Sequence, residues 1–173
     1  MPVDAPWADV GIDIGKRRIA FGWPAWHMSD SFDLGKKPGP SRDWELRHMQ
    51  HWLNRYIPDG ARLWIDQAFP GHSVAAAMDL AETISAVRTA QDWVNPPVVV
   101  HSSTWKSAVL GNHLASKEEM LEWLTDTHPL LALQCATEDE VDAMIIGLYG
   151  TMRSNGHVPP PGPRRRRTRK KAA

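Results

Sequence analysis

The order of strand-like and helical segments is the feature that most limits what this chain can fold into. Helical periodicity covers residues 41–57 and 71–94. Short apolar runs typical of strands occupy residues 8–15, 19–26, 31–34, 61–66 and 98–101. Three early strands, the first two paired antiparallel, are thus followed by alternating helices and strands. This order predicts an α/β domain with a mixed five-stranded sheet and helices on both faces.

Further helices are predicted after the last strand. A short one covers residues 103–110, and two capping-box sequences follow it, Ser116 to Glu119 and Thr137 to Glu140. A Ser or Thr with a Glu three residues later satisfies free amides at a helix start. The second capping box therefore predicts a helix over residues 138–153.

The chain of 173 residues is long enough for one domain, placed at residues 1–158. Residues 159–173 lack a large apolar side chain that could offset the entropy of ordering, so a disordered tail is predicted there. No apolar run approaches the ~18 residues of a membrane span, and the first residues lack the basic region of a signal peptide. One cysteine, Cys135, excludes an internal disulfide framework and a multi-cysteine zinc site. We therefore expect a cytoplasmic location.

The formal net charge of zero conceals an asymmetry. Seven of the 20 basic residues lie in the tail, and all 20 acidic residues precede it. The domain thus has 13 basic against 20 acidic side chains, a net charge of −7, while the tail carries +7. Such a split is typical of a nucleic-acid-binding arm on an acidic domain. The basic residues of the tail are Arg164, Arg165, Arg166, Arg167, Arg169, Lys170 and Lys171.

Four aspartates stand where a sheet of this kind could bring carboxylates together. Asp13 lies in the first strand and Asp66 ends the fourth, while Asp139 and Asp142 share one face of the last helix. Strand ends in an open α/β sheet face a common crevice, which a late helix could cross. Taken singly, each aspartate could also be a cap or a loop residue.

The apolar neighbours of Asp13 and Asp66 favour a metal site. Asp13 lies between two isoleucines and Asp66 follows a tryptophan and an isoleucine, and a buried carboxylate needs a partner. Between the loop at residues 35–40 and the tail, the only lysines are Lys106 and Lys117, too few to neutralise four acids. Oxygen ligands suit Mg²⁺ or Mn²⁺. Two such ions about 4 Å apart would support phosphodiester hydrolysis.

In their order along the chain, these segments resemble the RuvC family of Holliday-junction resolvases, which have a ribonuclease H-like fold. The resemblance rests on GIDIG around Asp13, DQAF from Asp66 and DEVDA from Asp139. Trp105-Lys106 and the run GNHLASK at 111–117 resemble the family's lysine-bearing segment. The match spans residues 8–153.

The resemblance implies a divalent-metal-dependent endonuclease that resolves Holliday junctions and other branched DNA by paired strand incision. Lys106 and Lys117 would contact phosphates beside the scissile bond, and Phe69 would stack on a base at the crossover. The metal ligands implied are Asp13, Asp66, Asp139 and Asp142, holding two ions of Mg²⁺ or Mn²⁺.

The family is homodimeric, and the resemblance places the helix at 71–94 at or near the two-fold axis. An apolar stripe on this helix is broad enough to be covered from two sides. It consists of Val74, Met78, Ala81, Ile84 and Val87.

Two features depart from the family's pattern. Most members carry glutamate where this chain has Asp66, and the shorter side chain is expected to favour Mn²⁺. The basic tail is not expected of the cellular enzymes, which work with a branch-migration motor. A compact domain with such a tail favours a phage-encoded relative that acts in an infected bacterial cell.

Other functions are compatible with parts of this pattern. One is a ribonuclease H-like nuclease that cuts RNA or RNA–DNA hybrids, and another is a non-catalytic DNA-binding protein that uses the tail and the nine tryptophans. A nucleotide binder of the sugar-kinase or actin type shares the first-strand motif but needs two such domains. His101, His113 and His128 lack metal-ligand spacing, so surface or capping roles are expected for them.

Overall fold

The computed structural model describes residues 8–15, 18–33, 39–57, 60–67 and 73–157. The sheet has the strand order β3-β2-β1-β4-β5. β2 pairs antiparallel with both β1 and β3, whereas β1, β4 and β5 run parallel. The strands are β1 (Asp9–Ile14), β2 (Arg18–Trp23), β3 (Met28–Asp33), β4 (Arg62–Gln67) and β5 (Val98–His101). The predicted mixed five-stranded sheet is therefore confirmed.

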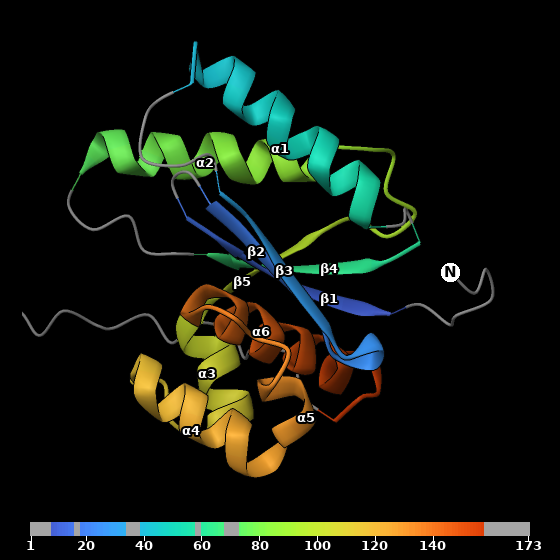
Figure 1. Ribbon diagram of the computed structural model, residues 1–173, viewed down its shortest axis with the longest axis vertical. Helices are drawn as coiled ribbons and strands as arrows, with labels where there is room; N and C mark the ends of the chain where they lie inside the picture. The colour runs from blue at the N-terminus through green and yellow to red at the C-terminus, as the bar shows by residue number, and fades with distance from the viewer. Residues whose placement is uncertain (1–7, 16–17, 34–38, 58–59, 68–72, 158–173) are drawn as a thin grey trace, which may run out of the picture.

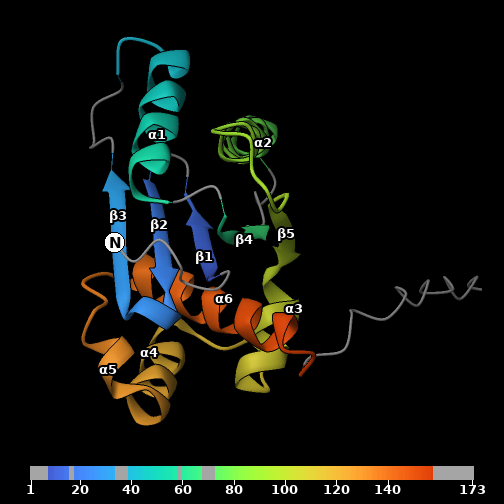
Figure 2. The same ribbon diagram turned by 90° about the vertical axis from the view of Figure 1, so that its right-hand side faces the viewer.

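Helices cover both faces of this sheet (Figure 1). α1 (Arg42–Tyr56) and α2 (Val74–Arg88) form one layer. The opposite layer holds α3 (Ser102–Leu110), α4 (Lys117–Thr127), α5 (Pro129–Ala132) and α6 (Glu138–Ser154). The turned view in Figure 2 shows the sheet between the two layers. Among the described residues, no helix is both long and apolar enough to cross a membrane.

Each face of the sheet has its own buried apolar cluster. On the α1–α2 side, Ile12 and Leu63 pack with Met49 and Leu53 of α1. On the α6 side, the cluster contains Trp105, Met120, Leu124, Met144 and Ile145. Successive side chains of a strand point to opposite faces, so Asp13, which follows Ile12, faces the α6 layer.

Glycines let α6 lie directly on β1 and β2. A Cβ atom on Gly11 would lie 2.0 Å from the carbonyl oxygen of Ala143, and one on Gly22 would lie 2.3 Å from Cα of Met144. No real side chain fits at such distances. The backbone of α6 therefore touches the strands, which brings the first turns of this helix to the end of β1.

Several element boundaries differ from those predicted. β2 ends at Trp23 because Pro24 begins a 3₁₀ turn, and β3 begins at Met28 and pairs along the whole of β2. The helix predicted at 71–94 ends at Arg88 in the structure. Residues 34–38 and 68–72, and with them Phe69, lie outside the described residues.

The predicted apolar stripe of α2 does not form a single face. Val74 and Met78 are 76% and 60% exposed. Val87, in contrast, is buried, and Ile84 packs against the apolar cluster on the α1–α2 side. From Leu80 onward α2 packs on the core, so the large exposed side chains of the stripe lie in its first half, and Ala81 is exposed as well.

Candidate active site

Two of the four aspartates lie side by side on neighbouring strands. β1 and β4 are parallel and pair Ile12 with Ile65, so Asp13 and Asp66 occupy the next position on each strand. Both therefore point toward the layer of α6. The sequence prediction that the strands bring these two carboxylates together agrees with this register.

The other two aspartates, Asp139 and Asp142, lie in α6, and hydrogen bonds fix the first turn of this helix. Glu140, which lies between them, is buried, and its carboxylate accepts hydrogen bonds from Ser29 Oγ at 3.1 Å and Ser31 Oγ at 3.0 Å on β3. Thr137 caps the helix by accepting from the Glu140 amide at 3.3 Å. A full capping box would also have the Glu140 carboxylate accept from the amide of Thr137. In the structure this carboxylate accepts from the Ala136 amide, at 2.8 Å, instead.

The negative charges of the other three aspartates all act on the pKa of Asp13. Burial is the largest cause that raises the pKa of Asp13, to about 7, and the charges of Asp142, Asp66 and Asp139 raise it further. Lys117 acts in the opposite direction. A carboxyl with such a shifted pKa beside three others marks a candidate functional site.

Asp66 is the most firmly held of the four. It is only 8% exposed and accepts hydrogen bonds from Trp105 Nε1 at 3.0 Å and from Ser102 Oγ at 2.9 and 3.0 Å. Burial raises its pKa, while the bonds from Trp105 and Ser102 lower it in part. The sequence motif pointed to Trp105, but no pattern marked Ser102.

Asp142 has one paired and one unpaired oxygen. Its Oδ2 accepts a hydrogen bond from Lys117 Nζ, and its buried Oδ1 has no hydrogen-bond partner among the described residues. Burial raises the pKa of Asp142 although Lys117 opposes this. Burial also lowers the pKa of Lys117, but its hydrogen bond to Asp142 and the charges of Asp142, Asp13 and Asp139 outweigh this, so that pKa is raised.

Arg18 is a further cation of the site that the sequence analysis treated only as part of a polar turn. Its guanidinium bridges Asp33 Oδ2, at 2.6 Å, and Asp139 Oδ2, at 3.1 Å. The antiparallel register places Arg18 opposite Asp33, which is a pairing that only the folded sheet reveals.

The remaining predicted site residues are placed as follows. Lys106 donates to the carbonyl oxygen of Ala115 at 2.9 Å and lies 5.4 Å from the ring centroid of Trp105. His101 caps α3 by accepting from the Ser103 amide. The tail, residues 159–173, lies outside the described residues, so its predicted disorder and the DNA-binding role of its basic residues stay predictions.

The donor set fits a hard divalent cation. Carboxylate oxygens are the ligands that Mg²⁺ and Mn²⁺ prefer, and the unpaired buried Oδ1 of Asp142 lacks the partner that such an atom needs. Within the described ranges, no three acidic, histidine or cysteine side chains are already arranged to hold an ion. Instead, the ammonium of Lys117 lies against Asp142 and 3.7 Å from Asp139 Oδ1.

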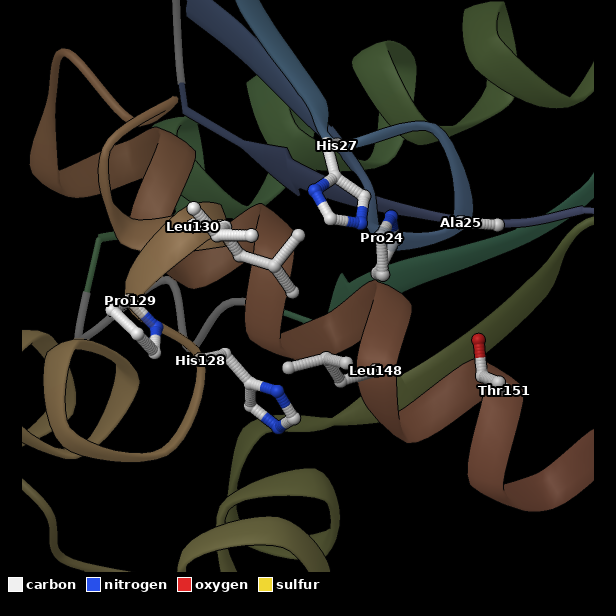
Figure 3. A pocket seen from close by; sticks show the side chains of 9 residues that line it. Pro24, Ala25, His27, His128, Pro129, Leu130, Leu148 and Thr151 are labelled. Carbon is white, nitrogen blue, oxygen red and sulfur yellow. The ribbon is translucent and has the colours of Figure 1, made fainter.

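A separate hollow lies toward the other end of α6 (Figure 3). Its volume is about 430 Å³, and Leu148 and Thr151 of α6 line it together with His27, His128 and Leu130. Most of the described residues that line it are apolar, and none of them is a carboxylate. Since α6 rises about 1.5 Å per residue, Thr151 is ~13 Å along the helix from Asp142. This hollow is distinct from the carboxylate site.

Comparisons with known proteins identify the fold. The structure of Thermus thermophilus RuvC is similar to this chain with a TM-score of 0.65 and 17% identity, covering 86% of this chain and 96% of that one. A structure of T. thermophilus RuvC in complex with a Holliday junction substrate matches with a TM-score of 0.66 and 18% identity, covering 87% and 97%. No family model and no curated protein matches the sequence. The predicted ribonuclease H-like fold is therefore confirmed.

Proposed function

We propose that this protein is a divalent-metal-dependent endonuclease that resolves Holliday junctions and other branched DNA by paired incision. The observation that carries the proposal is the convergence of four carboxylates from β1, β4 and α6, one of which has a buried oxygen with no partner within the described ranges. It is supported by the fold shared with RuvC, a protein also solved with a Holliday junction substrate.

In this proposal, each side chain of the site has a stated task. Asp13, Asp66, Asp139 and Asp142 hold the metal ions, and Trp105 and Ser102 keep Asp66 in one orientation. Lys106 and Lys117 contact phosphates beside the scissile bond. When bound, the two ions supply an activated water for attack on phosphorus and stabilise the leaving oxygen.

The paired incision requires two such sites. A two-fold symmetric dimer is the common way to relate two identical sites, and we propose that this chain acts as one. The surface that would form it is the exposed first half of α2, at Val74 and Met78.

The proposal is tested by cleavage of a mobile four-way junction in Mg²⁺ and in Mn²⁺, with both incisions mapped. We expect two symmetric cuts. Cleavage should be faster in Mn²⁺ because the side chain of Asp66 is shorter than a glutamate, and Mn²⁺ tolerates irregular coordination geometry better than Mg²⁺ does. Asp13→Asn, Asp139→Asn and Asp142→Asn should each abolish cleavage while junction binding survives. Asp126→Asn, on the exposed side of α4, is the matched control and should cut normally.

An RNA–DNA hybrid and a linear duplex are cut in parallel under the same conditions. Faster cleavage of the hybrid would favour a ribonuclease instead. Normal turnover by Asp139→Asn or Asp142→Asn would contradict the carboxylate centre itself.

A further inference from the structure

The carboxylate centre already contains a cation of its own. Lys117 Nζ donates to Asp142 Oδ2 and lies 3.7 Å from Asp139 Oδ1. Both aspartates are residues to which the proposed function assigns metal ions. The ammonium thus lies against two carboxylates that a divalent cation would also bind, and the positive charges of the two cations repel each other.

The position of Lys117 allows its ammonium to move away from the carboxylates without disturbing the fold. It is the first residue of α4, whose start is fixed by the Ser116–Glu119 capping box rather than by the lysine. Its side chain is 38% exposed, and a lysine has a long flexible stem with a compact charge at its tip. Rotation of that stem moves the ammonium toward solvent and leaves the helix in place.

The aspartates, in contrast, stay where they are when the ammonium leaves. Arg18 holds Asp139 through its other oxygen, Oδ2, and is itself braced by Asp33. Asp142 lies on α6, whose first turn is tied to β3 through Glu140. One cation can therefore replace another at a centre whose geometry is already fixed.

We propose that Lys117 is the counter-ion of the metal-free centre, that a divalent cation must displace it from Asp142 and Asp139, and that the freed ammonium then contacts the DNA phosphate. This inference rests on the proposed function and adds an order to it, with metal binding first and phosphate contact by Lys117 second. While its ammonium is bound to the carboxylates, Lys117 cannot contact a phosphate. Metal binding therefore determines whether Lys117 pairs with the aspartates or with DNA.

Lys106 provides a matched control. Its charge also acts on Asp66 and Asp142, but its ammonium donates to the carbonyl oxygen of Ala115. Replacing Lys106 removes one positive charge from the same neighbourhood without removing the contact with the carboxylates. The difference between the two lysine variants isolates direct competition from the general effect of charge.

The test is a calorimetric Mn²⁺ titration of the full-length protein without DNA, at fixed pH and ionic strength. Because a competitor is removed, Lys117→Met should bind Mn²⁺ about tenfold more tightly than the unaltered protein. Lys106→Met should gain no more than about threefold, and Lys117→Arg, which keeps the charge, should gain nothing. Equal gains in the two methionine variants, or weaker binding by Lys117→Met, would overturn the inference but leave the metal site standing. If none of the proteins binds Mn²⁺, the metal site of the proposed function fails with it.

A second measurement uses the unaltered protein and does not depend on a variant that folds. Lysines are acylated with and without Mn²⁺, and modification is read by peptide mass spectrometry. A lysine held between carboxylates reacts slowly, so Mn²⁺ should raise the labelling of Lys117 several-fold and leave that of Lys106 unchanged. Labelling of Lys117 that stays constant or falls when Mn²⁺ is added would contradict the displacement.

Discussion

At the scale of single residues, the buried aspartates of this protein differ in how well they are paired. Asp9 is buried and accepts hydrogen bonds from Arg62 Nη2 at 2.9 Å, Trp64 Nε1 at 2.8 Å and Ser154 Oγ at 2.8 Å. It joins the end of α6 to β1 and β4, and both of its oxygens have partners. Asp142 instead keeps a buried oxygen to which no residue in the described part of the chain donates. A carboxylate whose bonds are complete serves structure, whereas an incomplete one is available for a ligand.

The raised pKa of Asp13 predicts a pH-dependent stability in the presence of chelator. Below pH ~4 this group is protonated in both the folded and the unfolded state, so it contributes nothing. As pH rises from ~4 to about 7, the unfolded chain releases the proton and the folded protein retains it, so the free energy of unfolding falls. Above pH about 7, Asp13 is ionised in the folded protein too, and the free energy of unfolding is lowered by the full cost of burying its charge.

Asp13→Asn removes this cost. In thermal melts at pH 8 the variant should be about 1–2 kcal/mol more stable than the unaltered protein, which corresponds to ~2–8 °C in Tm. At pH 4 the two melts should coincide. Asp126→Asn serves as the control and should show no such difference, and a variant that is less stable at pH 8 would contradict the electrostatic origin of the effect.

At the scale of elements, the site depends on how closely α6 approaches the sheet. Asp139 and Asp142 reach Asp13 only because the helix backbone rests on Gly11 and Gly22 of the strands. A side chain at either glycine would lift the first turns of α6 away from the end of β1.

Gly11→Ala should therefore destabilise the protein and open the site. The new Cβ would meet a backbone oxygen 2.0 Å away, and overpacking against backbone costs about 3 kcal/mol at the upper end of its usual range. We expect the Tm to fall by ~6–12 °C and cleavage to fall with it. Gly15→Ala on the same side of the site is the matched control, because its Cβ would lie 3.4 Å from the nearest atom. Melts that are unchanged for both variants would show that α6 adjusts freely.

At the scale of the whole molecule, large apolar side chains remain exposed on both sides of the sheet. Val74 and Met78 project from α2 on one side of the sheet, and Leu130 of α5, 62% exposed, lies on the other. The two surfaces belong to opposite helical layers (Figure 1). This separation allows the proposed dimer surface to be tested against an apolar surface of the same kind.

Met78→Glu should dissociate the proposed dimer. A carboxylate buried in an apolar interface lacks solvation, so the dimer Kd should rise at least ~30-fold, as measured by light scattering over a concentration series. Leu130→Glu should stay dimeric because it lies on the opposite layer. A monomeric unaltered protein that still makes both cuts in one encounter would refute the dimer.

The tail should supply salt-dependent affinity for DNA. Each phosphate neutralised contributes about −0.9 to the slope of log affinity against log salt, so four or five engaged tail residues correspond to roughly 4 units. Truncation after Pro163 should reduce the slope by that amount, equally for junction and linear DNA, because phosphate contacts do not read sequence or branching. An identical slope before and after truncation would show that the tail does not touch DNA.

The sequence by itself determined the elements and the four aspartates. Alternating apolar and small residues predicted β1, a short apolar run predicted β4, the Ser116 capping box predicted the start of α4, and the order of the elements predicted the mixed α/β sheet. These features depend on local periodicity and on neighbours in the chain, which can be read directly from the sequence.

The tertiary structure decided which groups pair within the site. Arg18 pairs with Asp139 across 121 positions of the sequence, and Lys117 pairs with Asp142. Ser102 and Glu140 acquire their roles because helices α3 and α6 bring them to Asp66 and to β3. The exposure of Met78 beside the burial of Val87 likewise depends on where α2 rests on the core. Hydrogen bonds and ion pairs form only between groups a few ångströms apart, and the folded chain alone sets those distances.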